Sequence, residues 1–324
     1  MIPTKTRAAS SLALAFLFTA TIANAQTYPN RPITLVMPVA AGGPNDTAGR
    51  VVAQRLSMIL GQSIVIENRA GAGGTIANAA VARAAPDGYT LLFATAGTYV
   101  QSAALYKNLS YDIDRDFVAV SQMLVQPLVM STSLGAPANL KDFVAYAKAN
   151  PGKMNYGSAG HATSGHLAGL LFSKVAGIDA VHVPFRAASA VSTALMQNEV
   201  QYFFDTAFTA KPHVDNGRLR VLGVAGDRRS NALPDVPTFI EAGYPGFTAQ
   251  TWAGIVVPAG TPREIVERLH AASKDTVVAK EVQASFAKFD TRAVGNSPAE
   301  FTALIAEEFK KWKAIAAEFN ITVE

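Results

Sequence analysis

The segment ITLVMPVAAGGPNDTAGRVVAQRLSMILG, residues 33–61, contains the pattern that decides the fold. An apolar run at 33–39 leads into a glycine-rich loop, PVAAGGPNDTAGR at 38–50. Apolar residues then recur at helical spacing, with polar residues on the other side, and Gly61 ends the pattern. The apolar face consists of Ala48, Val51, Val52, Leu56, Ile59 and Leu60. This segment predicts a strand, a loop and a helix in direct succession.

Short apolar runs separated by longer helical patterns continue along the chain. This alternation predicts an α/β fold with mostly parallel sheets that are covered by helices on both faces. The predicted strands are 33–39, 63–69, 89–95, 117–124, 128–132, 154–158, 180–185, 200–205, 219–226 and 254–260. Two helical segments at 261–282 and 297–319, each entered by Thr-Pro or Ser-Pro, are expected to be packing helices.

A second unit resembles the first in its order of elements. KMNYGSAGHATSGHLAGLLFSKVAG, residues 153–177, again runs from a strand through a Gly/Ser-rich loop into a helix. Because ligands of open α/β sheets bind at the carboxyl ends of strands, the two loops are expected to face each other across a cleft. We expect domain 1 to comprise residues 26–126 plus 250–324, and domain 2 to comprise residues 127–249.

The N-terminus has the three parts of a secretory signal peptide. Lys5 and Arg7 precede the run SSLALAFLFTATIA, and cleavage is expected near Ala25/Gln26. Residues 1–25 are therefore predicted to be a signal peptide, with a retained anchor or a buried helix as the alternatives.

The composition excludes several classes of function. The formal net charge is +4 and the basic residues are scattered, so we expect no nucleic-acid partner. Cysteine is absent, which excludes disulfides, thiolate metal sites and cysteine nucleophiles. No further segment reaches 18 consecutive apolar residues.

The two loops have the chemistry of anion sites. The start of a helix carries unpaired N–H groups and partial positive charge, which attract a carboxylate or phosphate. In the first loop Gly42 and Gly43 supply backbone freedom, and Asn45 and Asp46 could cap the helix. The second offers the hydroxyls of Ser158, Thr163 and Ser164 beside the amides of Ala159 and Gly160. The simpler alternative is two ordinary strand-to-helix turns.

Enzyme motifs are weak or missing. No phosphate-binding loop occurs, and GAGGTIAN at 71–78 lacks the last glycine of a dinucleotide fingerprint. The serines lack G-x-S-x-G spacing, and His161 and His166 are not at i, i+4, so neither catalysis nor a metal is expected. A secreted hydrolase that uses Ser164, paired with His166, or Ser158 remains an alternative.

Two charged residues leave alternatives open. Asp205 ends the run VQYFFD and could accept a hydrogen bond from a ligand hydroxyl, amine or water, or could cap the helix that starts at Thr206. Arg186 could meet a distal carboxylate of the ligand or remain a solvated surface residue.

Six segments together resemble the Bug-type solute receptors of tripartite tricarboxylate transporters, in the same order and over nearly all of the chain after the signal peptide. They are YPNRPITLVMPVAAGGPNDTAGRVVAQRL, VIENRAGAGGTIANAAVARAAPDGYTLLFA, LSYDIDRDFVAVS, MNYGSAGHATSGHLAGLLF, LPDVPTFIEAGYPGF and WAGIVVPAGTP.

The resemblance implies a type II-like periplasmic binding protein, a two-domain α/β fold with its ligand cleft at the hinge. It implies capture of a small organic acid in the periplasm and delivery to membrane permease subunits, without a cofactor or metal, by a monomer. A ligand receptor for a membrane sensor is the alternative. The ligand-binding residues implied or expected are Val39, Ala40, Ala41, Gly42, Gly43, Asp46, Thr95, Ser158, Ala159, Gly160, Thr163, Ser164, His166 and Asp205.

The chain departs from the family pattern at three places. The first loop has VAA where relatives usually carry an aromatic or larger residue, and Ala187 replaces a glycine. At 197–199 the chain has QNE where relatives often have Gly-Gly-Gln or a similar sequence. The first departure alters the pocket wall, so the identity of the ligand does not follow from relatives.

Overall fold

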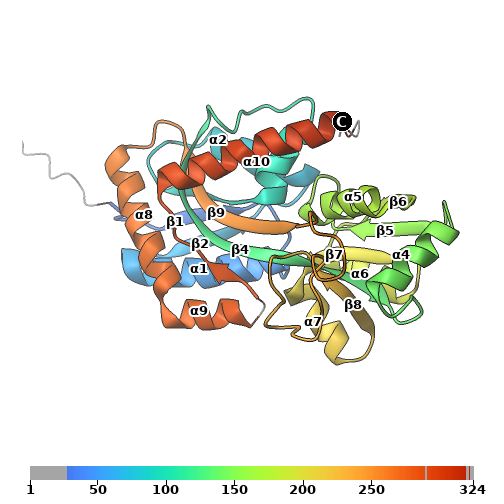
Figure 1. The fold of residues 1–324 in the computed structure, drawn as a ribbon. Coiled ribbons are helices and arrows are strands. Elements are labelled where there is room, and N and C mark those ends of the chain that lie inside the picture. Colours follow the sequence, from blue (N-terminus) through green and yellow to red (C-terminus); the bar gives the residue numbers. More distant parts are fainter. Residues whose placement is uncertain (1–27, 289, 319–320, 322–324) are drawn as a thin grey trace, which may run out of the picture.

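The computed structural model describes residues 28–288, 290–318 and 321. The predicted signal peptide at 1–25 lies outside these residues. Within them, the chain forms a mixed α/β fold in which ten strands share one extended sheet (Figure 1). No helix in this part of the chain combines the length and the hydropathy that a membrane span requires.

The first half of the sheet has the strand order β2-β1-β3-β9-β4. Strand β1 pairs in parallel with β2 and β3, whereas β9 pairs antiparallel with both β3 and β4. These strands are β1 (Ile33–Met37), β2 (Ile64–Asn68), β3 (Thr90–Thr95), β4 (Phe117–Ser133) and β9 (Gln250–Pro258). A short strand, β10 (Arg292–Ala293), adds to β4.

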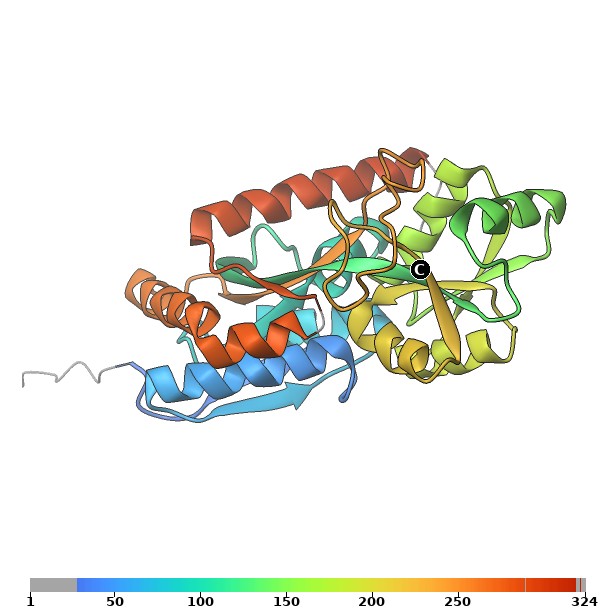
Figure 2. The same cartoon turned by 60° about the horizontal axis from the view of Figure 1, so that its bottom comes forward.

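Helices cover both faces of this half. Alternate residues of one strand enter different cores, because side chains point to opposite faces: Leu35 packs with one cluster and Val36 with the other. The first face is covered by α1 (Pro44–Leu60), α8 (Arg263–Val278) and α9 (Lys280–Ala287). The second is covered by α2 (Thr75–Ala82), α3 (Ser102–Leu105) and α10 (Pro298–Glu318). Figure 2 shows α10 and α1 on opposite sides of the central strands.

The second half repeats this plan around β5. Strand β5 pairs in parallel with β6 and β7, and β7 and β8 both pair antiparallel with the distal part of β4. Its strands are β5 (Met154–Ser158), β6 (Ala180–Pro184), β7 (Tyr202–Thr206) and β8 (Leu219–Val224). Its helices are α4 (Leu140–Ala149), α5 (Ser164–Ala176), α6 (Ala188–Met196) and α7 (Ala207–Asp215). Phe172, Phe204 and Phe239 occupy its largest core.

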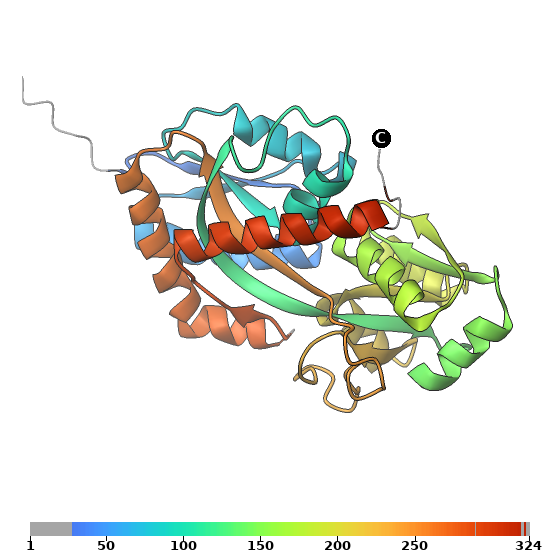
Figure 3. The same ribbon diagram turned by 45° about the horizontal axis from the view of Figure 1, so that its top comes forward.

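Two features join the halves. Strand β4 changes partners at Pro127, which is the last residue in register with β9, and the pairing with β7 begins at Leu128. Proline has no N–H for a ladder bond, so this is a position where pairing with one partner strand can end and pairing with another can begin. Helix α10 crosses β4 and β9 toward the second half (Figure 3), and Trp312 shares a buried cluster with Leu167 of α5.

The predicted α/β class is confirmed, and each predicted strand corresponds to a strand of the structure. Two details differ. The runs at 117–124 and 128–132 form the single strand β4, because Pro127 lies within it without interrupting its direction. The segment 261–282 forms two helices rather than one, since Ala279 adopts an extended conformation (φ −64°, ψ 131°) between α8 and α9.

Candidate functional site

A cavity of about 1280 Å³ lies where the parallel strands of both halves end. Its lining comes from the residues that follow β1, β2, β3, β5, β6 and β7, the place where open α/β sheets bind ligands. The two glycine-rich loops, 38–45 and 159–165, both contribute to it. A second pocket of about 270 Å³ shares no residue with this cavity, and Glu67 and Arg69 in its lining pair with each other.

The first loop presents an open helix start. Gly43 is the N-cap of α1, and no side chain caps the helix there. Gly42 has φ +83°, a left-handed conformation that suits glycine. The N-terminal amides of α1 therefore lack a side-chain acceptor, which leaves them to bind water or a ligand oxygen.

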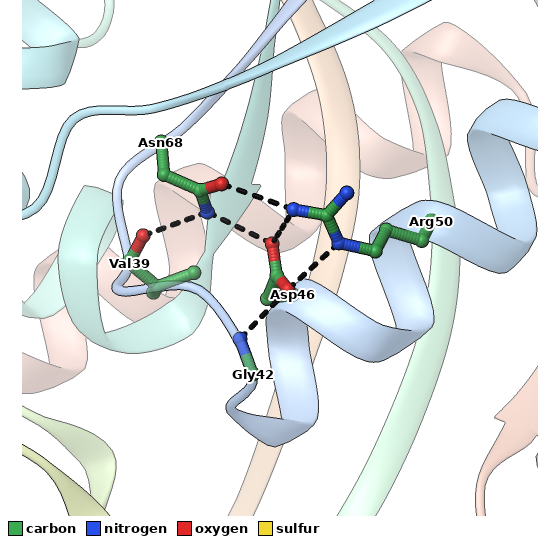
Figure 4. A network of polar contacts seen from close by, with 5 residues as sticks. All are labelled: Val39, Gly42, Asp46, Arg50 and Asn68. Carbon is green, nitrogen blue, oxygen red and sulfur yellow. Dashed lines mark hydrogen bonds and ion pairs between the residues drawn. The ribbon is translucent and has the colours of Figure 1, made fainter.

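Asp46 fixes this loop from behind (Figure 4). Its buried carboxylate accepts hydrogen bonds from the Gly42 amide at 2.9 Å, from Arg50 Nε at 2.9 Å and from Asn68 Nδ2 at 2.8 Å. Asn68 also donates to the Val39 carbonyl at 3.0 Å. Burial alone would raise the pKa of Asp46, but the bonds from Arg50, Gly42 and Asn68 outweigh it and lower the pKa. The charged carboxylate thus holds the loop directly at Gly42, and at Val39 through Asn68.

The second loop is held by its own hydroxyl groups. Thr163 is the N-cap of α5: its Oγ1 accepts from the His166 amide at 3.4 Å and donates to the Gly160 carbonyl at 2.9 Å. Ser164 Oγ donates to Gln101 Oε1 at 3.1 Å, and its oxygen lies 3.4 Å from the Thr251 hydroxyl oxygen. Ser164 therefore connects the second half of the sheet to residues that follow β3 and begin β9.

Three further helices begin in the cavity lining, of which the sequence analysis named only the one at Thr206, as the helix that Asp205 could cap. The starts of α2, α6 and α7 lie there, and none has a side-chain cap. For α2 the signal lies in Gly71, Gly73 and Gly74, which also form the weak dinucleotide motif. Gly74 has φ +93°, and a Cβ there would lie 2.4 Å from Thr98 Cβ. Several helix starts without side-chain caps thus lie at one cavity, where the partial positive charge of a helix N-terminus favours an anion.

Asp205 is the acidic group of the cavity. Its Oδ1 accepts from the Thr206 amide at 2.8 Å, whereas its buried Oδ2 accepts no hydrogen bond from the described residues. Burial raises the pKa of Asp205 to about 6, even though the Thr206 amide and the Thr209 hydroxyl beside the carboxylate lower it. Thr206, rather than Asp205, is the N-cap of α7, so the alternative role of Asp205 as the helix cap is not what the structure contains.

Three basic side chains also line the cavity: Arg186, His161 and His213. Arg186 is exposed and forms no ion pair within the described residues. It therefore lies at the rim of the cavity with its guanidinium available to an anion.

Most of the expected ligand-binding residues line the cavity. These are Val39, Ala40, Ala41, Gly42, Gly43, Thr95, Ala159, Gly160, Thr163, Ser164 and Asp205. Asp46, Ser158 and His166 are buried behind the lining and support the loops. Thr95 uses its hydroxyl locally, since Oγ1 accepts from the Thr98 amide at 3.1 Å.

The serines do not have the environment of a hydrolase nucleophile. Ser158 is fully buried, and its hydroxyl pairs with His182 Nε2 at 2.6 Å, not with His166. Burial, together with His166 and His161, lowers the pKa of His182 to about 3, which makes it a poor general base. Ser164 bonds to Gln101 and Thr251 instead of a histidine.

Comparison with known proteins places this architecture among solute receptors. The family model described as tripartite tricarboxylate transporter family receptor matches residues 48–321. A protein of Pseudomonas sp. (strain P51), the UPF0065 protein in the tcbD-tcbE intergenic region, is 35% identical over 97% of this chain and 94% of its own. Protein BugT of Bordetella pertussis is 32% identical over 94% of each chain.

Solved structures agree with the sequence matches. Rpa4515 of R. palustris with adipate has a TM-score of 0.86 at 30% identity, covering 91% of this chain and 99% of its own. MatC (Rpa3494) from Rhodopseudomonas palustris with bound malate has a TM-score of 0.82 at 33% identity, covering 89% of this chain and 99% of its own.

Proposed function

Because this chain belongs to the family of tripartite tricarboxylate transporter receptors, we propose that it binds a small organic acid in the cavity between the two loops. The observation that carries the proposal is the convergence of helix starts without side-chain caps on one cavity. Unpaired amides at such helix starts bind carboxylates. Two relatives of the same fold were solved with the dicarboxylates malate and adipate.

The ligand carboxylate is assigned to the first and second loops, with bridging waters. A cavity of about 1280 Å³ exceeds the volume of a small acid, so water fills the remaining space and mediates further contacts. Arg186 at the rim is the candidate partner for a distal carboxylate.

Asp205 selects among acids. Its unpaired Oδ2 requires a donor, and a ligand hydroxyl or amine supplies one, whereas a second carboxylate there would be repelled. We therefore expect a 2-hydroxy or amino acid to bind more tightly than the matching acid without that group.

Ligand capture is coupled to a closing movement of the two domains about β4 and β9, the two strands at which the chain passes from one domain to the other. The domain limits 26–126 plus 250–324 and 127–249 fall at Pro127 and Gln250, which are paired in register on β4 and β9. Rotation at this pair would move the two loops relative to each other, and a ligand favours the closed form only through contacts made there. Delivery to permease subunits in the membrane follows from the family, with export by the predicted signal peptide to the periplasm.

A screen of purified, ligand-free protein tests the proposal. Malate, succinate, adipate, phthalate and aspartate are added, and the melting temperature is measured; a ligand at 100 times its Kd stabilises the folded state by about 2.7 kcal/mol. At least one acid is expected to raise the melting temperature, and malate is expected to exceed succinate. Unchanged melting temperatures across carboxylates would refute the proposal.

A matched pair of variants tests the location. Ala40 is exposed and lines the cavity, so Ala40→Asp adds negative charge at the first loop, and Ala40→Asn adds similar volume without charge. Calorimetry is expected to show at least tenfold weaker acid binding, about 1.4 kcal/mol, for the aspartate variant relative to the asparagine variant. Equal affinities would place the carboxylate elsewhere.

A further inference from the structure

Three imidazole side chains converge beside the second loop. His161 comes from the loop, His166 from α5 and His182 from β6, and one ring nitrogen from each lies within 4.8 Å of the other two. The spacing of His161 and His166 argued against a metal site, but the sequence could not show that His182 joins them. The proposed function assigns no role to this cluster.

The cluster combines a fixed pair with an exposed third ring. The rings of His166 and His182 are tilted by 30° with centroids 3.9 Å apart, and Tyr156 packs against both. His161 meets both edge-on, with centroids at 5.8 Å and 5.2 Å, and its side chain is exposed. His161 can therefore turn without disturbing the core, whereas the other two rings are held in place.

Hydrogen bonds determine which nitrogen atoms are available. Ser158 Oγ lies 2.8 Å from the Gly160 carbonyl and 2.6 Å from His182 Nε2, and when its single proton goes to the carbonyl it accepts from Nε2–H. The lone pair of His182 then lies on Nδ1. This arrangement is typical of a metal-binding histidine, whose second nitrogen is held by an outer partner that fixes the tautomer.

His166 and His161 differ in whether a bound ion would have to displace a hydrogen bond. His166 Nδ1 accepts a hydrogen bond of 3.2 Å from the Ala162 amide. An ion must either replace that N–H or bind Nε2 after the proton has moved to Nδ1. The ring of His161 has no hydrogen bond within the described residues that would compete.

From this geometry we infer that His161, His166 and His182 bind a divalent transition-metal ion of the zinc class. Three imidazoles without a carboxylate suit Zn²⁺, Cu²⁺ or Ni²⁺ rather than Mg²⁺ or Ca²⁺. Tetrahedral bonds of about 2.0–2.1 Å require the nitrogen atoms to be roughly 3.3 Å apart, so the exposed His161 must move inward. A fourth position remains for water, and because His161 lines the cavity, that ion would lie beside it.

Calorimetric titration with ZnCl₂ tests the site directly. The protein is purified without a histidine tag, treated with chelator and titrated in the absence of organic acids, so the result is independent of the proposed function. One ion per chain is expected to bind, and His161→Ala is expected to weaken binding at least tenfold. His213→Ala is the matched control, because it removes another cavity-lining imidazole outside the cluster.

Two further measurements separate a built site from surface binding. Co²⁺ in place of Zn²⁺ is expected to give the intense visible absorption of four-coordinate cobalt, and MgCl₂ is expected to give no saturable binding. His161 is exposed, so its variant keeps the fold, which circular dichroism verifies. Absence of saturable Zn²⁺ binding to the unsubstituted protein, or equal affinity in His161→Ala, would overturn the inference.

Discussion

The Ser164 hydroxyl donates a 3.1 Å hydrogen bond to Oε1 of Gln101, across the boundary between the two halves of the sheet. Ser164 begins α5 in the second half, and Gln101 ends the helical turn 96–101 that follows β3 in the first. Ser164 lines the cavity, whereas Gln101 is buried outside the lining, and the bond between them is part of the contact between the halves. Any movement of one half against the other must change this bond.

A double-mutant cycle measures that contact. Ser164→Ala and Gln101→Ala are expected to couple by about 0.5–1.5 kcal/mol in the free energy of unfolding, the usual net contribution of a hydrogen bond. Urea unfolding of the two single variants and the double variant gives the value. Strictly additive effects would mean that the bond does not form in solution.

Asp205 is expected to make stability depend on pH. Its pKa of about 6 in the folded state exceeds the unfolded value near 3.9, so the folded protein binds the proton more tightly. The resulting stabilisation is complete below about pH 4 and is lost as the pH rises through 6. When the pH rises from 4 to 7.5, the free energy of unfolding of the unsubstituted protein is therefore expected to fall by about 1–2 kcal/mol relative to that of Asp205→Asn. This difference is smaller than the pKa shift alone would give, because water in the cavity screens the charge. The difference is read from urea unfolding at the two pH values, and a constant difference would contradict the raised pKa.

Asp46 is expected to show the opposite dependence. Its lowered pKa means that its contribution is present above about pH 4 and is lost as the pH falls further. Asp46→Ala is expected to cost about 2–3 kcal/mol at pH 7, because the Gly42 amide and Asn68 lose a buried acceptor. Arg50→Ala is the control: its side chain is 52% exposed, so its loss should cost less than the loss of Asp46.

Gly74→Ala is expected to damage the cavity lining. The substitution combines a left-handed backbone with a Cβ 2.4 Å from Thr98, and it should cost roughly 2–4 kcal/mol. Gly217→Ala is the matched control, since Gly217 has φ +61° but nothing within 4 Å of its Cβ. Chemical unfolding of both variants separates the clash from the backbone strain, and equal costs would show that the clash relaxes freely.

Thr163→Ala tests the cap of α5 in the second loop. Loss of the hydroxyl removes the acceptor for the His166 amide and the donor to the Gly160 carbonyl, and should cost about 0.5–2 kcal/mol of stability. Once an acid ligand is identified, its affinity should fall as well, because the loop amides lose their support. Thr163→Ser keeps both hydrogen bonds and is expected to retain stability and binding; the same loss in both variants would assign the effect to the methyl group.

The sequence by itself determined the order of the elements and the two loops. The alternation of short apolar runs with helical periodicity gave the α/β class, because each period matches one backbone geometry regardless of the rest of the chain. The glycine-rich turn before α1 and the hydroxyl-rich turn before α5 were recognisable for the same reason: their signals lie within a few consecutive residues. The similar motifs in sequence order supplied the family.

Only the tertiary structure decided what each side chain meets. Asp46 and His166 were expected in the ligand site, but the packing of their neighbours buries them behind it. The helix starts of α6 and α7, the unpaired Oδ2 of Asp205 and the approach of His182 to His161 depend on strands that are far apart in the chain. Local periodicity records which face of an element is apolar, but contacts between remote residues arise only when the sheet brings its carboxyl ends together, so no local pattern contains them.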